Sequence, residues 1–352
     1  MHATTVAIDL AKDVFELAFA DSAGRILERK RLTRRAFAHC LENRPPLAVV
    51  MEACGSAHYW GRRFQGQGHS VRLLPPRDVR PYVRRNKTDR ADAAGLVEAA
   101  RCGQIDAVPI KSPRQQGLQA LHRVREQLKG QRTAAINLVR GVLREFGVAI
   151  PIGADKLAPA VRAALEDGQN DLPMPLRATV AAQMEHIAAL AADMVAIEKR
   201  LAEEAAQDLT VQRFRTVPGV GLLTATALRA ATGELARFRS GRHLAAWIGL
   251  VPREHSSGNQ RRLGTITKRG DGYLRMLLIH GGRAVLRAAA VRRRAGGELD
   301  PLQAWALDLQ LRQGHNKAAV GVANKLARRL WALEHHGAAF DPRHVSAKPQ
   351  AA

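Results

Sequence analysis

Residues 4–20 read TTVAIDLAKDVFELAFA, and this stretch indicates the fold class of the first third of the chain. It holds two apolar runs with β-branched residues, Thr4–Leu10 and Val14–Ala20. A third run, Arg25–Leu32, follows the turn-rich residues 21–24. Short apolar runs separated by turn residues predict strands joined as a meander. We therefore expect the chain to open with three consecutive strands.

Helices and strands are expected to alternate from there to about residue 110. The apolar runs Pro46–Met51 and Val71–Leu74 are typical of buried strands. Helical segments are expected over 34–42, 58–67 and 89–101, the last with Thr88 as its N-cap. Residues 1–110 are therefore predicted to form an α/β domain with a mixed sheet.

Four acidic residues in this domain are placed where they would converge. Asp9 ends the first strand, and Glu52 follows the apolar run at 46–51. Asp89 and Asp92 lie three residues apart, which puts both on one face of a helix. Converging carboxylates repel one another unless cations lie among them, and hard divalent ions, Mg²⁺ or Mn²⁺, are the usual occupants. Each acid alone is typical of a turn, a cap or a solvated face, but the set predicts a ribonuclease-H-like nuclease core.

Residues 111–208 carry helical periodicity in two stretches. Apolar residues recur every three or four positions over Leu121–Phe146 and over Val180–Leu201, with a Gly- and Pro-rich break at 147–175. Near-heptad spacing predicts two long helices that form a coiled coil, within the chain or between chains. An ordinary helical hairpin on a globular domain explains the same pattern.

The net charge of +23 is concentrated near the C-terminus. The segment Arg237–Arg294 holds 14 Lys and Arg against two acids within 58 residues. A folded chain this basic favours a polyanionic partner, and nucleic acid is the usual one. A merely solvated basic surface, or that of a ribosome-like protein, is the alternative.

Composition also excludes several classes of protein. The chain has no run of about 18 apolar residues, which argues against a transmembrane helix and a membrane partner. No signal-peptide pattern opens the chain. Cys40, Cys54 and Cys102 are too far apart for a disulfide framework or a zinc knuckle. We therefore expect a protein of the reducing cytoplasm.

The region 209–345 is expected to be mainly helical, followed by a flexible tail at 346–352. Gly219 and Gly221 lie between two helix-like segments. A Gly-x-Gly hairpin exposes backbone N–H groups at a helix N-terminus, where a phosphate is favoured. This predicts a helix-hairpin-helix, although a plain Gly-rich turn fits the same residues. A dinucleotide-binding motif is excluded because no strand precedes it and its third glycine is missing.

A Ser-Ser-Gly sequence, residues 256–258, lies inside the most basic stretch. A plain linker is one interpretation. The other is a nucleophilic serine, because a hydroxyl attacks a phosphodiester when cations neutralise the developing charge. His243, His255 and His280 lie nearby in sequence, but their spacing commits none of them to a role. The residues expected to contact nucleic acid are Lys87, Gly219, Gly221, Arg253, Arg261, Arg262, Lys268 and Arg269.

The assembled motifs resemble the insertion-sequence transposases of family one hundred and ten and the related Piv-type DNA invertases. The family's N-terminal RuvC-like domain is matched by Ile8-Asp9 with Lys12, by Glu52-Ala53-Cys54-Gly55 and by Asn86-Lys87-Thr88-Asp89-x-x-Asp92. Its C-terminal transposase domain is matched by Val217–Gly221, Ala245–Arg253, Ser257-Gly258 and Lys268–Gly270. The resemblance covers nearly the whole chain in the right order.

This resemblance implies a mechanism and partners. Asp9, Glu52, Asp89 and Asp92 would be catalytic and hold Mg²⁺. Ser257 would form a covalent phosphoserine link to DNA, and it is favoured over Ser256 because Gly258 follows it.

The family's enzymes are recombinases guided by a structured bridge RNA that pairs with donor and target double-stranded DNA. Their homodimers assemble to a tetramer, in which the RuvC-like domain of one subunit completes an active site with the serine domain of another. A location at the nucleoid of a prokaryote follows from the same resemblance.

Two other functions stay open. A metal-only nuclease, such as a junction resolvase, would need the acids and be indifferent to Ser257. An architectural nucleic-acid binder with an inactive nuclease core would bind with a steep salt dependence and cut nothing.

Overall fold

The computed structural model describes residues 2–83 and 88–343. The predicted contact residue Lys87 and the predicted tail at 346–352 lie outside this range. The chain divides into two compact units, Met1–Arg114 and Gln115–Ala352, and each is described by itself. The predicted boundary near residue 110 lies close to this division. A further boundary near 208 stays a prediction, because the central helices and the C-terminal region belong to one unit.

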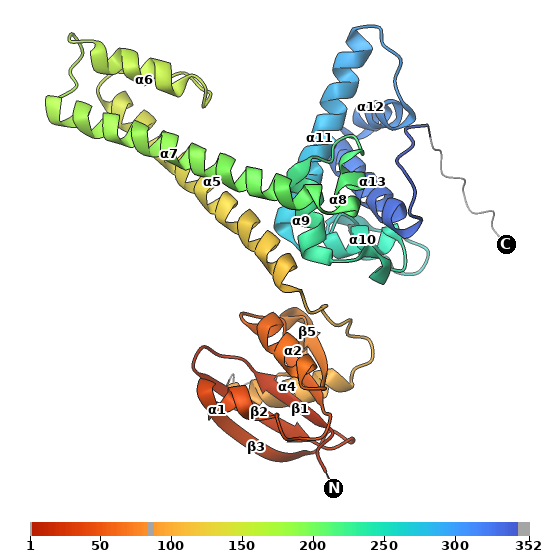
Figure 1. The fold of residues 1–352 in the computed structure, drawn as a ribbon. Coiled ribbons are helices and arrows are strands. Elements are labelled where there is room, and N and C mark those ends of the chain that lie inside the picture. The colour runs from red at the N-terminus through yellow and green to blue at the C-terminus, as the bar shows by residue number, and fades with distance from the viewer. Residues whose placement is uncertain (1, 84–87, 344–352) are drawn as a thin grey trace. The chain divides into compact units, whose positions relative to one another are not determined.

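The first unit is built on a five-stranded mixed sheet (Figure 1). Its strands are β1 (Thr5–Asp9), β2 (Val14–Ala20), β3 (Ile26–Thr33), β4 (Ala48–Glu52) and β5 (Ser70–Leu74), in the order β3-β2-β1-β4-β5. The first three form the predicted antiparallel meander. β4 pairs parallel with β1, and β5 pairs parallel with β4. The carboxyl ends of β1 and β4 are therefore neighbours at one edge of the sheet.

Helices cover both faces of this sheet. They are α1 (Arg34–His39), α2 (Ala57–Gly66), the short α3 (Pro76–Val79) and α4 (Asp89–Arg101), with a 3-10 turn at Arg80–Tyr82. Side chains of α1 and α2, among them Phe37 and Trp60, pack with Ile8 and Met51 on one face. Side chains of α4 pack with alanine and valine residues of the strands on the other face. The Thr88 hydroxyl accepts a hydrogen bond from the Ala91 N–H at 3.2 Å, which confirms the predicted N-cap.

The second unit begins with an arm of two long helices, α5 (Pro113–Glu145) and α7 (Met174–Ala206). They lie side by side in Figure 1 and are antiparallel, because Ile136 packs near Ile187 whereas Leu118 packs near Leu201. The predicted break between them contains a further helix, α6 (Leu157–Glu166). Leu157 and Val161, one turn apart, bury α6 against the arm. The two helices thus form a hairpin within the chain, and coiled-coil geometry remains a prediction.

Helix α7 has an unusually apolar composition. By length and mean hydropathy it is the one helix of the described chain that is able to cross a membrane. The sequence contains no uninterrupted apolar run of the length that a membrane span needs, which argues against any such helix. The mean hydropathy of α7 is high nonetheless, because its many alanines raise it between polar residues. Ile187 and Ile197 are buried against α5 and its neighbours. One helix of this kind is weak evidence for a membrane, since core helices have the same composition.

The rest of the second unit is a helical body containing one small hairpin. Its elements are α8 (Leu209–Arg215), α9 (Leu222–Thr232), a 3-10 turn at Leu235–Arg237, α10 (Gly241–Ile248), β6 (Pro252–Glu254), β7 (Leu263–Ile266), α11 (Gly272–Arg294), α12 (Pro301–Gln313) and α13 (His315–His335). A single apolar core joins α8 to α13. The chain is thus a mixed α/β protein with many helices, as predicted, and its first unit is consistent with a ribonuclease-H-like domain.

Candidate active site and nucleic-acid interface

Asp9 and Glu52 occupy neighbouring register positions at the carboxyl ends of β1 and β4. Ile8 pairs with Met51 in the parallel ladder, so the next residue of each strand continues the same register. Side chains alternate along a strand, which puts both acids on the face that carries Ala7 and Val50. Burial raises the pKa of the nearby Cys54 thiol, and the charges of Glu52 and Asp9 raise it further. The charges of both carboxylates therefore influence the same side chain, Cys54, at the carboxyl ends of the two strands.

Asp89 and Asp92 lie in the first turn of α4, which covers that same face. Ala93 and Leu96 pack against the strand residues beneath the helix, and both acids continue this stripe toward the helix N-terminus. The last residue of α4, Arg101, contacts Gly24, which lies beyond the β1 residue Thr5 because Thr5 pairs with Ala20. The helix therefore runs antiparallel to β1. Its acidic first turn is directed toward the strand ends that carry Asp9 and Glu52.

The four acids do not form a complete set of metal ligands within the described residues. Among residues 2–83 and 88–343, no three His, Cys, Asp or Glu side chains are grouped closely enough to hold a metal ion. The structure brings Asp9 together with Glu52, whereas Asp89 is exposed at the start of α4. Carboxylate oxygens from two strand ends and one helix turn are the donor set that Mg²⁺ and Mn²⁺ prefer. Asp9 and Glu52 therefore supply part of a donor set that suits a divalent ion, and completion of that set by Asp89 and Asp92 remains a prediction.

A fifth carboxylate lies at this edge and was missed by sequence reasoning. Glu16 on β2 pairs directly with Asp9 in the antiparallel ladder and is half-buried. Cross-strand partners share a face, and like charges placed opposite one another are unfavourable without a cation. The sequence feature that could have revealed Glu16 is the length of the turn at 10–13, because this length sets the register of β2 against β1.

Ser257 lies at the tip of the β6–β7 hairpin in the second unit. Its backbone exchanges two hydrogen bonds with Gln260, at 3.2 and 3.1 Å, so that only Gly258 and Asn259 form the turn. Gly258 has a φ of +53°, a conformation that glycine adopts without a side-chain clash. Residues 252–265 are exposed throughout. The serine therefore stands on a projection that no core residue covers.

The adjacent serine is engaged inside the hairpin. The Ser256 hydroxyl donates to Glu254 Oε1 at 2.7 Å and accepts from the Arg262 N–H at 3.1 Å. Arg261 Nε lies 3.6 Å from the same glutamate oxygen. For Ser257, the bonds within the described chain involve its backbone groups only. The two neighbouring serines thus differ in the hydrogen bonds that their hydroxyls make.

The basic loop after β7 is seated on α10 by backbone contacts. A Cβ on Gly249 would lie 2.3 Å from the Arg269 carbonyl oxygen, and one on Gly270 would lie 2.0 Å from that of Trp247. Arg275 donates to the Ile248 and Arg269 carbonyls at 3.0 and 2.9 Å. Lys268 and Arg269 are exposed, and Lys268 has a φ of +54°. The packing thus fixes the loop and leaves both cationic side chains in solvent.

The two glycines of the predicted helix-hairpin-helix differ in their surroundings. The hairpin joins α8 to α9 as expected. Gly219, with a φ of +87°, meets the backbone of Gly281 on α11. Gly221 is the exposed N-cap of α9, and a Cβ there would meet nothing within 4 Å. Only Gly221 therefore has a backbone that is open to a ligand, and phosphate binding by this hairpin remains a prediction.

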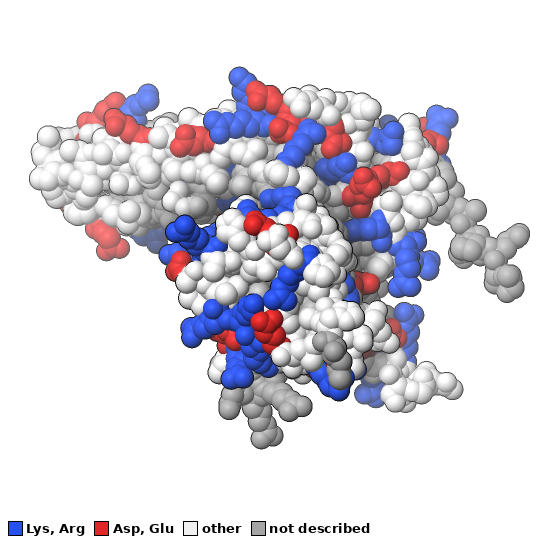
Figure 2. All heavy atoms as spheres, turned by 60° about the horizontal axis from the view of Figure 1, so that its bottom comes forward, with Lys and Arg blue, Asp and Glu red and all other residues white. Residues whose placement is uncertain are grey.

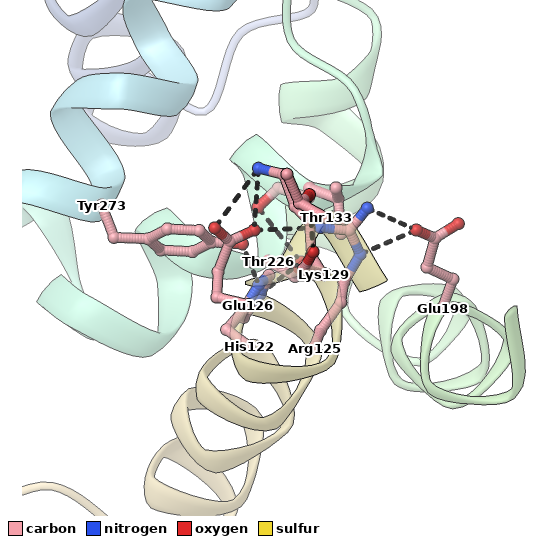
Figure 3. A network of polar contacts seen from close by, with 9 residues as sticks. His122, Arg125, Glu126, Lys129, Thr133, Glu198, Thr226 and Tyr273 are labelled. Carbon is pink, nitrogen blue, oxygen red and sulfur yellow. Dashed lines mark hydrogen bonds and ion pairs between the residues drawn. The ribbon is translucent and has the colours of Figure 1, made fainter. Parts of the chain in front are cut away.

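A polar network ties the base of the arm to the helical body (Figure 3). His122 Nδ1 lies 3.0 Å from the Tyr273 hydroxyl, and Nε2 lies 3.0 Å from Thr226 Oγ1. Burial lowers the pKa of His122 to about 4, with a contribution from Arg125. Burial likewise raises the pKa of Tyr273 to about 12. Tyr273 is the second residue of α11, so the arm contacts the helix that begins directly after the basic loop.

The three histidines near the serine loop have different surroundings. His255 and His280 are exposed. His243 packs edge-on against Phe238, and its buried Nδ1 has no hydrogen-bond partner within the described residues. The structure assigns no proton transfer to these side chains. Basic side chains are spread over the face drawn in Figure 2 rather than gathered in one patch.

An α/β unit with acidic strand ends and a basic helical unit with an exposed serine are features of a protein that processes nucleic acid. Residues 211–295 match the model of the "Transposase IS116/IS110/IS902 family", and residues 6–148 match a DEDD transposase model of the same insertion-sequence group.

The chain is 41% identical to a "Probable family 20 transposase" of Pseudomonas aeruginosa, over 97% of this chain and 100% of that protein. It is 37% identical to the "Transposase for insertion sequence element IS1111A" of Coxiella burnetii, over 93% and 88%. A "Pilin gene-inverting protein" of Moraxella bovis is 26% identical over 73% and 75%. The chain belongs to the IS116/IS110/IS902 family of transposases, enzymes of DNA recombination.

Proposed function

We propose that this transposase cuts and rejoins DNA through Ser257, with a divalent ion held by Asp9, Glu52, Asp89 and Asp92. The single observation that carries the proposal is the contrast between the two serines. The Ser256 hydroxyl is held by Glu254 and the Arg262 N–H, whereas Ser257 lies exposed at the hairpin tip. A nucleophile must reach a phosphodiester, and the exposed position at the tip permits this approach.

The chemistry balances without a further reactant. The Ser257 oxygen bonds to phosphorus while one bridging P–O bond breaks; the serine proton passes to solvent, and the released strand end takes up a proton as a hydroxyl. A hydroxyl from another strand then attacks the phosphorus and releases its proton to solvent, the P–O bond to Ser257 breaks, and the serine oxygen takes up a proton. The energy of the phosphodiester is kept in the covalent link, so rejoining needs no cofactor energy.

In this proposal, the basic residues, the four acids and Gly221 each contact the nucleic acid or the ion in a different way. Arg253, Arg261, Arg262, Lys268 and Arg269 neutralise the phosphate as its charge develops. The ion bound by the four acids would supply Lewis-acid stabilisation of the transferring phosphate. Gly221 offers its backbone N–H to a more distant phosphate. By family resemblance, the acids and the serine of one site belong to different subunits of a dimer that assembles to a tetramer.

Specificity is proposed to come from a structured bridge RNA that pairs with donor and target DNA. Base pairing would then read sequence, and the protein would read backbone and shape. The net charge of +23 suits a chain that holds several polyanions together. Activity is expected in the prokaryotic cytoplasm, at the nucleoid.

A trapping assay tests the proposal. The protein, its co-purifying RNA and DNA with the element junction are incubated with Mg²⁺ or Mn²⁺, then denatured and examined for protein joined covalently to DNA. An adduct present in wild type and in Ser256→Ala but lost in Ser257→Ala is the expected result. Cleavage without an adduct in any of the three proteins would overturn the proposal and favour a metal-only nuclease. Binding without cleavage would favour an architectural role.

A further inference from the structure

The solvent face of α11 carries a line of basic side chains. His280, Arg283, Arg287 and Arg294 recur at intervals of three, four and seven residues, which places them along one side of the helix. All four are exposed, whereas the opposite side buries Leu278, Val285 and other residues in the core. We name these four residues the α11 ridge. The helix from Gly272 to Arg294 contains no acidic residue.

The arginines of the ridge have no carboxylate partners within the described chain. Arg125, Arg229 and Arg312 form ion pairs with Asp or Glu side chains. The Arg283 side chain donates a hydrogen bond to Asn316 Oδ1 at 3.4 Å. Uncompensated positive charge in a row is typical of a surface that neutralises phosphates.

A second helix extends this surface sideways. The Arg283–Asn316 contact places the first turn of α13 beside the ridge. A Cβ on Gly282 would lie 2.3 Å from the Ala319 carbonyl oxygen, so the two helices touch backbone to backbone at this point. Lys317, exposed in the same turn of α13, therefore adds a further cation next to Arg283.

The ridge has the length of a nucleic-acid binding surface. An α-helix rises 1.5 Å per residue, so the ridge from His280 to Arg294 extends about 21 Å. One strand of a duplex rises about 3.4 Å per phosphate, so this length corresponds to roughly six phosphate steps. At its N-terminal end, α11 begins directly after the Lys268–Gly270 loop, and Arg275 bonds to the Arg269 carbonyl. The helix that carries the ridge is thus joined through this loop to β7 of the serine hairpin.

We propose that the α11 ridge, with Lys317, binds the phosphodiester backbone of a nucleic acid outside the cleavage site. The inference rests on the nucleic-acid partner of the proposed function and extends it to a surface on α11, outside the serine hairpin. The chemistry recognised is the phosphate backbone, which DNA and RNA share. Contacts of this kind position a strand and carry no base specificity.

The test compares two double variants of the full chain that remove equal charge. Arg283→Gln with Arg287→Gln alters the ridge, and Lys199→Gln with Arg200→Gln removes two exposed cations from α7. Binding of a DNA duplex and of an RNA duplex is measured by fluorescence anisotropy in EDTA over a range of salt concentrations. Circular dichroism and thermal melting check that both variants fold.

The ridge variant is expected to bind about 10-fold or more weakly, with a salt slope lower by about two for two lost phosphate contacts. The α7 variant should keep the wild-type slope. A loss with DNA alone, RNA alone or both names the nucleic acid on the ridge. A ridge variant that matches the α7 variant with both probes overturns the inference.

Failure of the proposed function would look different. If wild type forms no covalent adduct, Ser257 is not the nucleophile, and the anisotropy result still reports on the ridge. A ridge variant that forms the adduct at saturating DNA but binds weakly in EDTA supports both proposals.

Discussion

Gly219, in the turn between α8 and α9, lies backbone to backbone against Gly281 in the middle of α11. A Cβ on Gly219 would come within 2.7 Å of the Gly281 carbonyl oxygen, and one on Gly281 within 2.2 Å of that of Gly219. Neither position has room for a methyl group. The glycine motif at 217–221 therefore has a packing role, in addition to any contact with phosphate.

Replacement of these glycines should separate stability from binding. Gly219→Ala and Gly281→Ala are expected to lower the free energy of unfolding by about 2–3 kcal/mol, because backbone must move to admit the methyl group. Gly221→Ala, where space is open, should cost less than about 1 kcal/mol and mainly weaken DNA binding. Urea unfolding followed by circular dichroism measures the first effect and anisotropy the second. Equal stability of the three variants would contradict the packing role.

The four acids should be needed for recombination and dispensable for RNA binding. Asp9→Asn, Glu52→Gln, Asp89→Asn and Asp92→Asn are each expected to lower recombination by at least about 100-fold, since each removes a ligand charge. Glu98→Gln, on the exposed side of α4, is the control for charge loss on the same unit. Full activity of all four variants in a recombination assay would exclude an acidic metal site.

Glu16 should tune the same site from the opposite strand. It faces Asp9 across the ladder, so Glu16→Gln reduces the negative charge that favours a bound cation. We expect the Mg²⁺ concentration for half-maximal activity to rise several-fold while the maximal rate changes less. Titration of activity with Mg²⁺ checks this. An unchanged half-maximal concentration would mean that the Glu16 carboxylate is directed away from the ion.

Arg261 and Arg262 are expected to contact phosphate next to the serine. Changing both to Ala should weaken DNA binding irrespective of sequence and lower the salt slope by roughly one unit per lost contact. Arg261 also lies 3.6 Å from Glu254, so the single variants separate its ion pair from phosphate binding. Anisotropy over a salt series measures the slope. A wild-type slope in the double variant would show that both arginines face solvent in the complex.

His122 should make stability depend on pH in a defined window. The folded chain keeps this histidine neutral down to a pKa of about 4, whereas the unfolded chain protonates it near 6.5. The unfolded state therefore binds more protons between these values, and stability is lost as the pH falls from about 6.5 toward 4. The contribution is on the order of 3 kcal/mol.

The variant His122→Gln removes the titrating group while keeping polar atoms near Thr226 and Tyr273. Its unfolding free energy, measured by urea titration from pH 7 to about 4.5, should fall less steeply than that of wild type. His58 in the first unit, also with a pKa near 4, provides a comparison through His58→Gln. Parallel pH profiles for wild type and His122→Gln would refute the assignment.

The α/β unit was predictable because its signals are local. Strand runs and turns predicted β1 to β5, and Thr88 predicted the start of α4. Placing Asp9 beside Glu52 required one further step, the parallel pairing of β1 with β4, which is a contact between strands about 40 residues apart in sequence. Glu16 was missed because strand register depends on turn geometry, which residue types at 10–13 do not specify.

The serine hairpin was much less accessible to sequence reasoning. β6 and β7 have three and four residues, are exposed, and show no alternation of apolar and polar side chains. Pairing across the turn forms them, and such pairing leaves no hydrophobic pattern. The packing of Gly219 on Gly281 was equally hidden, because a glycine in a turn looks the same whether its backbone faces solvent or another helix.

The hydrogen bonds of His122 also bear on how the chain is made. His122 leaves the ribosome 104 residues before Thr226 and 151 residues before Tyr273. The apolar residues that join the outer parts of α5 and α7 have all been made once α7 is complete, whereas His122 at the base still lacks its partners from α9 and α11. The His122–Tyr273 contact at the base of the arm forms only once the start of α11, the helix that follows the basic loop, has been made. We therefore expect a chain truncated before α11 to contain the arm without the His122–Tyr273 contact, and the second unit to complete its fold only after its basic loop has been made.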